Sequence, residues 1–326
     1  MAKVADEMQY VTWNSCNAKM EDIDSWGDQL YAAVGNSNIL VQEVKNWDKD
    51  GDYRNWQLHK SSAVCKAGIL VPSELMNALK WSSDDDPQFC EFVYASGVQI
   101  ADVGAVSGYF VHSGSKNSDE EFMKGLCEVR SIFRVLVARG VSKLVLGCDL
   151  NLQLGSGLGE YTGYNVMAPP KSDARFRDRH DAFMKLCADF DFCVVNTFGD
   201  AADKSFTRGH WKDIRDFSVQ PPCKKTRFSY DDDLVYTNEF ADKPLTQIDY
   251  ICFSIKDRNT KKILHSEAKA INNLRIGNGD HFPVTMRAMK LDKPCKMNFR
   301  ENNSGWKWNS QNDETFLSVS YATHGS

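Results

Sequence analysis

Short apolar strands alternate with amphipathic helices along most of the chain, from Gln9 to about Met289. The predicted strands are 10–13, 39–42, 67–71, 100–103, 143–146, 193–196, 248–251 and 282–286, and the clearest helices run from about 119 to 139 and from about 178 to 189. The strands are rich in β-branched and aromatic residues, and the helices repeat apolar residues at helical spacing. This alternation favours an α/β sandwich over an all-β or all-α fold.

Composition narrows the class of protein. The 326 residues are 42% hydrophobic and 25% charged, which is enough to bury a large core as one large or two modest domains. No run of about 18 apolar residues appears, and the first residues lack the pattern of a secretory signal. Most of the ten cysteines sit beside apolar residues without CxxC pairs, so we expect buried free thiols. We therefore expect an intracellular protein in a reducing compartment, with no membrane segment.

The overall charge limits how the chain can bind a polyanion. The net charge is −5 and the sequence pI is about 5.8. These values argue against a protein that binds nucleic acid through a net positive charge. Binding of a polyanionic substrate would need a local basic patch and a bound cation. Carboxylates gathered at a metal site would themselves contribute to the acidity.

Asn, Glu, Tyr, His and Asp residues lie on the predicted strands or in the segments that follow them. Singly, each has an ordinary explanation as a strand-end carboxylate, a turn-forming Asn or a loop histidine. Together, an Asp on an apolar strand followed by an Asp-His pair is what a metal-assisted hydrolase needs to orient an imidazole against a phosphate. The residues in question are Asn14, Glu43, Tyr109, His112, Asp149, Asn151, Asp249, Asp280 and His281.

The order of these polar residues along the chain resembles that of the endonuclease/exonuclease/phosphatase superfamily, and the resemblance extends from about Gln9 to Met289. The resemblance implies a four-layered α/β sandwich of two packed mixed β-sheets flanked by helices, the DNase I-like fold. It also implies one domain over 9–290, interrupted by a long insertion at 208–246. Residues 1–8 would form an N-terminal tail, and 291–326 a flexible C-terminal tail or linker.

The resemblance assigns roles to the polar residues. It implies metal binding by Glu43, Asn14 and Asp280, and it implies catalysis by Tyr109, Asp149, Asn151, Asp249 and His281. Asn14 and His112 would contact the substrate phosphate, and Thr207, which matches the FT element of the superfamily, would support the active-site strands and line the substrate site. The implied cofactor is Mg²⁺ or Mn²⁺, since these cations prefer oxygen ligands. One or two metals, and Asp149 or His281 as the general base, remain open.

Four positions depart from the pattern of the superfamily. Cys16 stands where apurinic endonucleases usually carry Asp, and Val111 stands where many members have Pro. Arg208 stands where Trp is common, and Gln247 stands where Arg is common. The Gln-Ile-Asp-Tyr-Ile sequence at 247–251 is similar to the version found in non-LTR retrotransposon endonucleases. It therefore favours a retrotransposon-like nuclease over a repair enzyme.

The insertion at 208–246 interleaves basic and aromatic residues. Trp211, Lys224, Lys225 and Arg227 are candidates to neutralise phosphates or to stack on bases. The alternative is an ordinary solvated loop, because three consecutive aspartates at 231–233 cancel part of the charge.

The resemblance predicts a Mg²⁺-dependent phosphodiester hydrolase, and foremost a monomeric endonuclease that nicks DNA. The alternatives are an exonuclease, a deadenylase acting on RNA, a phosphatase of the same superfamily, or a catalytically inactive binding protein with this fold. A DNA substrate would favour the nucleus.

Overall fold

The structure is a computed structural model. It describes residues 7–48, 51, 53–114, 117–154, 161–163, 174–198, 207–208, 223–227, 234–238, 241–244, 246–254, 268–271, 280–289, 301–302 and 305–306. Two six-stranded sheets dominate these residues. Each sheet is mixed, with a single parallel pair of neighbouring strands at its centre.

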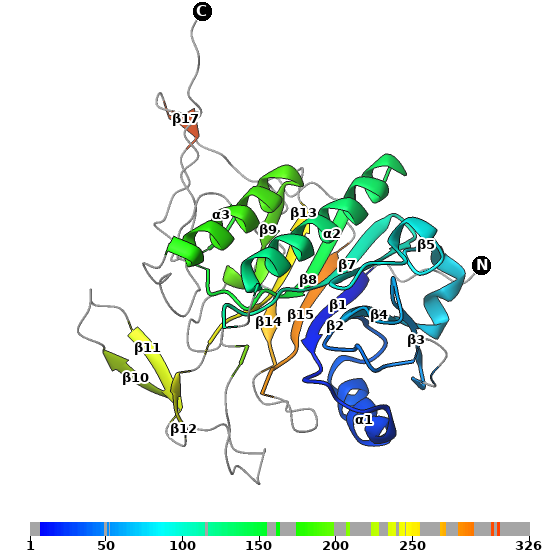
Figure 1. Ribbon diagram of the computed structural model, residues 1–326, viewed down its shortest axis with the longest axis horizontal. Coiled ribbons are helices and arrows are strands. Elements are labelled where there is room, and N and C mark those ends of the chain that lie inside the picture. The colour runs from blue at the N-terminus through cyan, green and yellow to red at the C-terminus, as the bar shows by residue number, and fades with distance from the viewer. Residues whose placement is uncertain are drawn as a thin grey trace, which may run out of the picture.

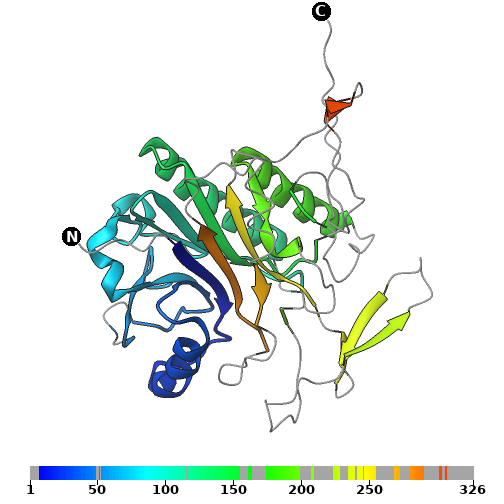
Figure 2. The same ribbon diagram turned by 180° about the vertical axis from the view of Figure 1, so that it is seen from behind.

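The first sheet joins the two ends of the domain. Its strand order is β14 (Lys269–Ala270), β15 (Val284–Met289), β1 (Glu7–Asn14), β2 (Asn38–Gln42), β4 (Ala67–Pro72) and β3 (Trp56–His59). Strands β1 and β2 are parallel, and the chain between them forms the 3₁₀ turn η1 (Met20–Asp22) and helix α1 (Ile23–Val34). Figures 1 and 2 show β1 and β15, far apart in sequence, side by side.

The second sheet repeats this arrangement. Its strand order is β5 (Leu79–Ser82), β6 (Ala95–Ile100), β7 (Val103–Tyr109), β8 (Lys143–Asp149), β13 (Asp249–Ser254) and β9 (Phe192–Val194). Strands β7 and β8 are parallel and are connected through α2 (Ser118–Ala138). Helix α3 (Ala174–Asp189) leads into β9, and short 3₁₀ turns lie at η2 (Ser73–Ala78), η3 (Pro87–Phe89) and η4 (Val195–Thr197).

Three groups of buried apolar residues hold the layers together. One lies between the sheets and includes Leu40 and Val145. A second packs α2 and α3 on the second sheet, and a third packs α1 on the first sheet around Trp13 and Trp26. The layers are therefore α1, sheet, sheet, and α2 with α3, as Figure 1 shows. This four-layered sandwich confirms the predicted fold.

The two sheets approach each other closely beneath the polar strand ends. A Cβ atom on Gly147 of β8 would lie 2.5 Å from the Leu40 side chain and 2.9 Å from that of Thr12. Nearby, the buried Gln42 amide donates to Thr12 Oγ1 in its own sheet and to Ser107 Oγ in the other, both at 3.1 Å. Glycine at 147 and this polar bridge allow the ends of β1, β2 and β8 to converge.

One of the predicted strands is wrong, and another ends earlier than predicted. Residues 100–103, predicted as a strand, form the turn of a hairpin in which Ile100 pairs with Val103. The two-residue loop places Ala101 at a φ of 52°, and its Ala-Asp sequence lacks the Gly or Asn that usually marks such a turn. The strand predicted at 193–196 ends at Val194, and η4 follows it.

Parts of the insertion and the tail are described. Strands β10 (Cys223–Arg227), β11 (Leu234–Asn238) and β12 (Ala241–Pro244) form a three-stranded antiparallel sheet. Strands β16 (Glu301–Asn302) and β17 (Gly305–Trp306) pair within 291–326. The remainder of the predicted C-terminal tail and residues 1–6 lie outside the described residues, so the predicted domain limits stay predictions.

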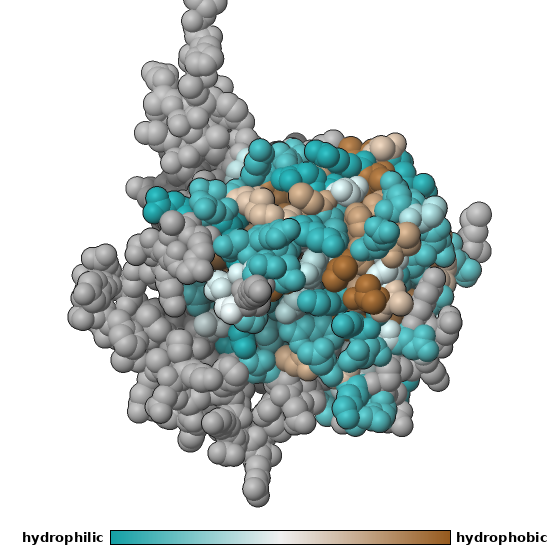
Figure 3. Space-filling view, in the orientation of Figure 1, coloured by the Kyte–Doolittle hydropathy of each residue, from teal (hydrophilic) through white to brown (hydrophobic). Residues whose placement is uncertain are grey.

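The face of the molecule in Figure 3 is mostly hydrophilic, with apolar side chains in small groups. Large apolar side chains exposed among the described residues are Tyr31, Val64, Met123 and Val137. None of the described helices combines the length and the hydropathy needed to span a lipid bilayer.

Candidate active site

Three neighbouring strands of the second sheet carry three of the predicted residues. Asp149 at the end of β8 pairs with Tyr109 at the end of β7 and with Asp249 at the start of β13. The strand register therefore sets these side chains in a row across one end of the sheet. A shift of one residue would turn each of them to the opposite face.

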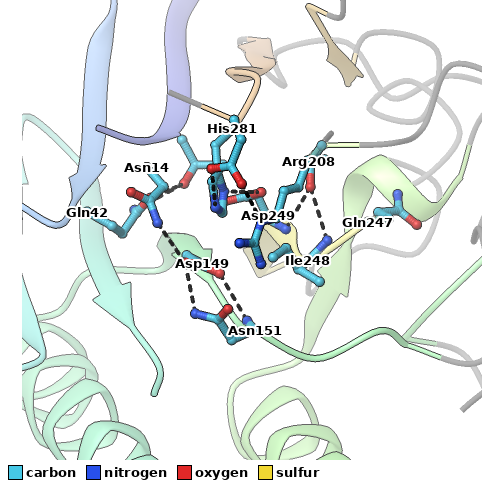
Figure 4. A network of polar contacts seen from close by, with 12 residues as sticks. Asn14, Gln42, Asp149, Asn151, Arg208, Gln247, Ile248, Asp249 and His281 are labelled. Atoms are coloured by element: carbon cyan, nitrogen blue, oxygen red, sulfur yellow. Dashed lines mark hydrogen bonds and ion pairs between the residues drawn. The ribbon is translucent and has the colours of Figure 1, made fainter. Parts of the chain in front are cut away.

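The first sheet brings its polar residues to the same end. Asn14 ends β1 and pairs with Gln42, which ends β2, and Glu43 follows directly. Asp280 and His281 come just before β15, the other neighbour of β1. Figure 4 shows Asn14 and His281 facing Asp149 and Asp249 across the gap between the sheets.

Asn14 connects the two sheets by its amide nitrogen. Nδ2 donates to Asp149 Oδ2 at 2.8 Å and to Glu43 Oε1 at 3.2 Å. Oδ1 accepts a hydrogen bond from the backbone N–H of Cys16 at 2.8 Å, and this contact fixes which amide atom faces the carboxylates. Asn14 is therefore a hydrogen-bond donor to both carboxylates here, and its predicted contacts with a metal and with the substrate stay predictions.

Asp149 is a fully buried carboxylate with three donors. Besides Asn14, it accepts hydrogen bonds from the backbone N–H of Asn151 at 3.0 Å and from Asn151 Nδ2 at 2.9 Å. Burial first, and the negative charge of Asp249 second, raise the pKa of Asp149 to about 7, although His281 and the Asn14 amide oppose this. The side chain can therefore exchange a proton near neutral pH.

His281 and Asp249 form a buried pair. The Nδ1 atom of His281 lies 3.0 Å and 2.9 Å from the two carboxylate oxygens of Asp249. Burial alone would lower the pKa of His281, but the carboxylates of Asp249, Asp149 and Asp280 raise it to about 9. With Nδ1 bonded to Asp249, the imidazolium would offer its Nε2–H to an anion.

Two buried side chains hold the start of β13 in place. Thr207 Oγ1 accepts hydrogen bonds from the backbone N–H groups of Ile248 and Asp249, each at 3.0 Å. Asn196 in η4 donates from Nδ2 to the Asp249 carbonyl at 3.1 Å and accepts from the Ile251 N–H at 3.0 Å. Thr207 thus supports the strand, and its predicted contact with substrate stays a prediction. Asn196 was missed as a site residue, because residues 193–196 were predicted as a strand.

Tyr109 lies between Glu43 and a lysine that the sequence did not single out. Its hydroxyl is hydrogen-bonded to Glu43, and burial, followed by the charges of Glu43 and Asp149, raises the pKa of Tyr109 well above its usual range. The phenol therefore stays protonated and can donate a hydrogen bond. The Lys66 ammonium lies 5.4 Å from the ring centre of Tyr109 and 5.1 Å from that of Tyr94, which places a cation beside the site.

The other predicted substrate contacts stay predictions. His112 is exposed, and its Nδ1 accepts from the backbone N–H of Gly114 at 3.0 Å. Lys224, Lys225 and Arg227 lie on β10, which is described by its backbone. Trp211 falls outside the described residues.

Known proteins resemble this chain in structure, and neither family models nor curated sequences match it. No protein-family model matches the chain, and a search of curated proteins finds no match. Among solved structures, the 3′ phosphatase NExo from Neisseria, bound to a product DNA hairpin, matches with a TM-score of 0.54 at 17% identity. That match covers 86% of this chain and 98% of NExo. The catalytic domain of APE2 from Xenopus laevis matches with a TM-score of 0.52 at 12% identity, over 88% of this chain and 95% of that domain.

The chain has the fold of the endonuclease/exonuclease/phosphatase superfamily. The endonuclease domain of TRAS1, a telomere-specific non-LTR retrotransposon, also matches, at 14% identity over 88% of this chain and 100% of that domain. Its TM-score of 0.48 is too low to assign the chain to the retrotransposon subgroup. The predicted DNase I-like fold is thus confirmed.

Two departures from the superfamily pattern meet at Asp280. Arg208 Nε donates to Asp280 Oδ2 at 2.9 Å, and Cys16 Sγ lies 3.4 Å from Asp280 Oδ1. The Arg208 backbone forms isolated β-bridges with Thr246 and His281. These bridges fix the position of the backbone from which the Arg208 side chain extends. Burial alone would raise the pKa of Asp280, but the charges of His281 and Arg208 lower it below its usual value. Neither Arg208 nor Cys16 was predicted as a site residue.

The donor atoms fit the magnesium ion that the superfamily implies. Glu43 and Asp280 are partly exposed carboxylates, and Asn17 Nδ2 holds Glu43 Oε2 at 2.8 Å. Carboxylate oxygens are the ligands that Mg²⁺ prefers, and the cation usually needs only one or two of them. Glu43 and Asp280 would hold it, and Asn14, whose NH₂ group donates to Glu43, would orient that carboxylate.

Left-handed backbone is concentrated at this site. Cys16, Asn17, Glu43 and Asn151 have φ values of 52°, 56°, 60° and 50°. A non-glycine residue in this region costs on the order of 1 to 3 kcal/mol. The surrounding hydrogen bonds must therefore hold these residues in place.

Proposed function

We propose that this chain is a Mg²⁺-dependent phosphodiester hydrolase, and that it acts as an endonuclease that nicks DNA. One observation carries the proposal, the buried constellation in which Asp149, Asp249 and His281 lie with their ligand atoms within 4.8 Å of one another. Asn14 ties that group to Glu43. Acids, an imidazolium and hydrogen-bond donors at one sheet end are the parts that phosphodiester hydrolysis requires.

Each side chain has a role in this proposal. His281, held by Asp249, donates from Nε2 to a phosphate oxygen. Asp149 accepts the proton of the attacking water, because its pKa of about 7 leaves the carboxylate available near neutral pH. Asn151 and Asn14 fix the Asp149 carboxylate, and Tyr109 donates to the phosphate. The Mg²⁺ ion, when bound at Glu43 and Asp280, supplies charge neutralisation on the phosphate.

A plasmid-nicking assay tests the proposal. With Mg²⁺ or Mn²⁺, the protein should convert supercoiled plasmid to the open-circular form, and EDTA should stop the reaction. Robust nicking in EDTA would contradict the metal requirement. Poly(A), DNA with a 3′ phosphate and a phosphoinositide, tested in parallel, separate the exonuclease, deadenylase and phosphatase alternatives. Turnover of none of them, with Mg²⁺ still bound, would favour an inactive binding protein.

The basic residues of β10 are proposed to strengthen DNA binding. Replacing Lys224, Lys225 and Arg227 together with Ala should weaken binding to duplex DNA. It should also reduce the slope of log affinity against log salt by up to about 0.9 for each phosphate that the protein no longer neutralises. Fluorescence anisotropy over a salt series measures both effects. Unchanged binding at low salt would remove this segment from the substrate site.

An intracellular location, in the nucleus if DNA is the substrate, belongs to the same proposal. The buried free thiols Cys148, Cys187 and Cys252 support a reducing compartment.

A further inference from the structure

Three different ligand types converge at Asp280, one of the two carboxylates of the proposed magnesium site. The Oδ1 atom of Asp280 lies 3.4 Å from Cys16 Sγ and 3.7 Å from His281 Nε2. All three ligand atoms lie within 4.8 Å of one another. A thiol, a carboxylate and an imidazole therefore lie close enough together to share one metal ion.

The spacing suits a tetrahedral metal ion. Zinc bonds are about 2.3 Å long to sulfur and about 2.0 to 2.1 Å long to oxygen or nitrogen. At tetrahedral angles, these lengths place a sulfur and an oxygen ligand about 3.5 Å apart, and a nitrogen and an oxygen ligand about 3.3 Å apart. The observed separations of 3.4 Å and 3.7 Å need only a small adjustment. We propose that Cys16, Asp280 and His281 form a binding site for a thiophilic divalent cation of the zinc class.

Each ligand is already oriented by a second contact. The Cys16 backbone is held in the left-handed region by the hydrogen bond from its N–H to Asn14 Oδ1. Arg208 holds Asp280 at Oδ2, and Asp249 holds His281 at Nδ1, opposite the nitrogen that would bind the metal. A carboxylate on the far nitrogen of a ligating histidine is the usual way in which proteins fix its tautomer and orientation.

The thiol distinguishes this site from the magnesium site of Glu43 and Asp280, with which it shares Asp280. Thiolate is a soft ligand that selects zinc or cadmium over magnesium, whereas the oxygen ligands of Glu43 favour magnesium. On binding, the sulfur–hydrogen bond of Cys16 breaks, a sulfur–metal bond forms and the proton passes to solvent. Three protein ligands leave the fourth tetrahedral position for water or for an oxygen of a ligand.

Metal binding here would oppose hydrolysis. The cation would occupy His281 Nε2, the atom that donates to the phosphate, so zinc should inhibit nicking. This consequence rests on the proposed function, whereas the existence of the site does not.

Cadmium titration of the whole chain tests the site directly. Cadmium thiolates absorb in the ultraviolet, so the wild type should gain this absorption with one tightly bound equivalent. The Cys16→Ser variant should lose that equivalent. The Cys127→Ser variant, which removes an exposed thiol on α2 away from the cluster, should keep it. Equal absorption in the wild type and Cys16→Ser at every cadmium concentration would overturn the proposal.

Two further measurements guard against a folding artefact. Circular dichroism should show that Cys16→Ser is folded, and Asp280→Asn, which keeps the thiol, should bind cadmium at least about tenfold more weakly. An Asp280→Asn variant that binds as tightly as the wild type would also overturn the three-ligand site. Zinc added to the plasmid assay should inhibit the wild type more than Cys16→Ser. If no variant nicks plasmid under any condition, the proposed function fails while the cadmium result still decides the site.

Discussion

An Asp249→Asn variant is expected to remain folded and to nick plasmid about 10³ to 10⁴ times more slowly than the wild type. The upper end of this range, about 10⁴, is the effect of the same change on the carboxylate that orients the histidine of serine proteases. An amide at 249 would no longer hold Nδ1 of His281 as a charged acceptor. The imidazolium would lose its main stabilising charge, and the ring could turn away from the phosphate.

Matched variants make this result interpretable. Asp102→Asn removes a carboxylate of the same type, but from a surface ion pair with Lys143, and should leave the nicking rate unchanged. His281→Ala should lose as much activity as Asp249→Asn, and the double variant should lose little more, since the two residues act as one unit. Activity of Asp249→Asn within tenfold of the wild type would show that His281 does not depend on this pair.

An Asp149→Asn variant is expected to nick plasmid about 10² to 10⁴ times more slowly, the range that general acid–base groups contribute. The amide cannot take up the proton of the attacking water. The NH₂ group of this amide is a donor and would face the donors of Asn14 or Asn151, so at least one hydrogen bond would be lost. The free energy of unfolding should therefore fall by about 1 to 3 kcal/mol.

Stability must be measured beside activity to separate these two effects. Urea unfolding gives the folded fraction of Asp149→Asn, and the rate is then expressed per folded molecule. A corrected rate near that of the wild type would exclude Asp149 as the base and leave His281 as the candidate. A large loss in the corrected rate would support the assignment to Asp149.

The fold and the central site residues could be read from the sequence because they follow from local pattern. Asn14, Glu43 and Asp149 stand at or just after the last residue of an apolar strand and Asp249 at the start of one, and the pairing of these strands brings them to one edge. The error at 100–103 arose because apolar patterning does not reveal a turn that lacks Gly or Asn.

The remaining site residues could not be found in this way. Arg208 and Cys16 reach Asp280 across sequence separations of 72 and 264 residues, and Lys66 approaches Tyr109 from the bend just before β4. Asn196 acts through the backbone of β13, in a turn that resembled a strand. Such interactions depend on how the sheets pack, and no local periodicity encodes that packing.

The left-handed residues at the site set a limit on how the protein can be engineered. Glycine at 16 or 43 would relieve backbone strain, so selection for heat resistance alone would favour it, and the thiol or the carboxylate would be lost with the strain. Variants recovered from such a screen with Gly at 43 should be stable and inactive, and those with Gly at 16 should be stable and lack the proposed zinc-class site. A thermostable but active version would have to gain its stability elsewhere, in the helices or between the sheets.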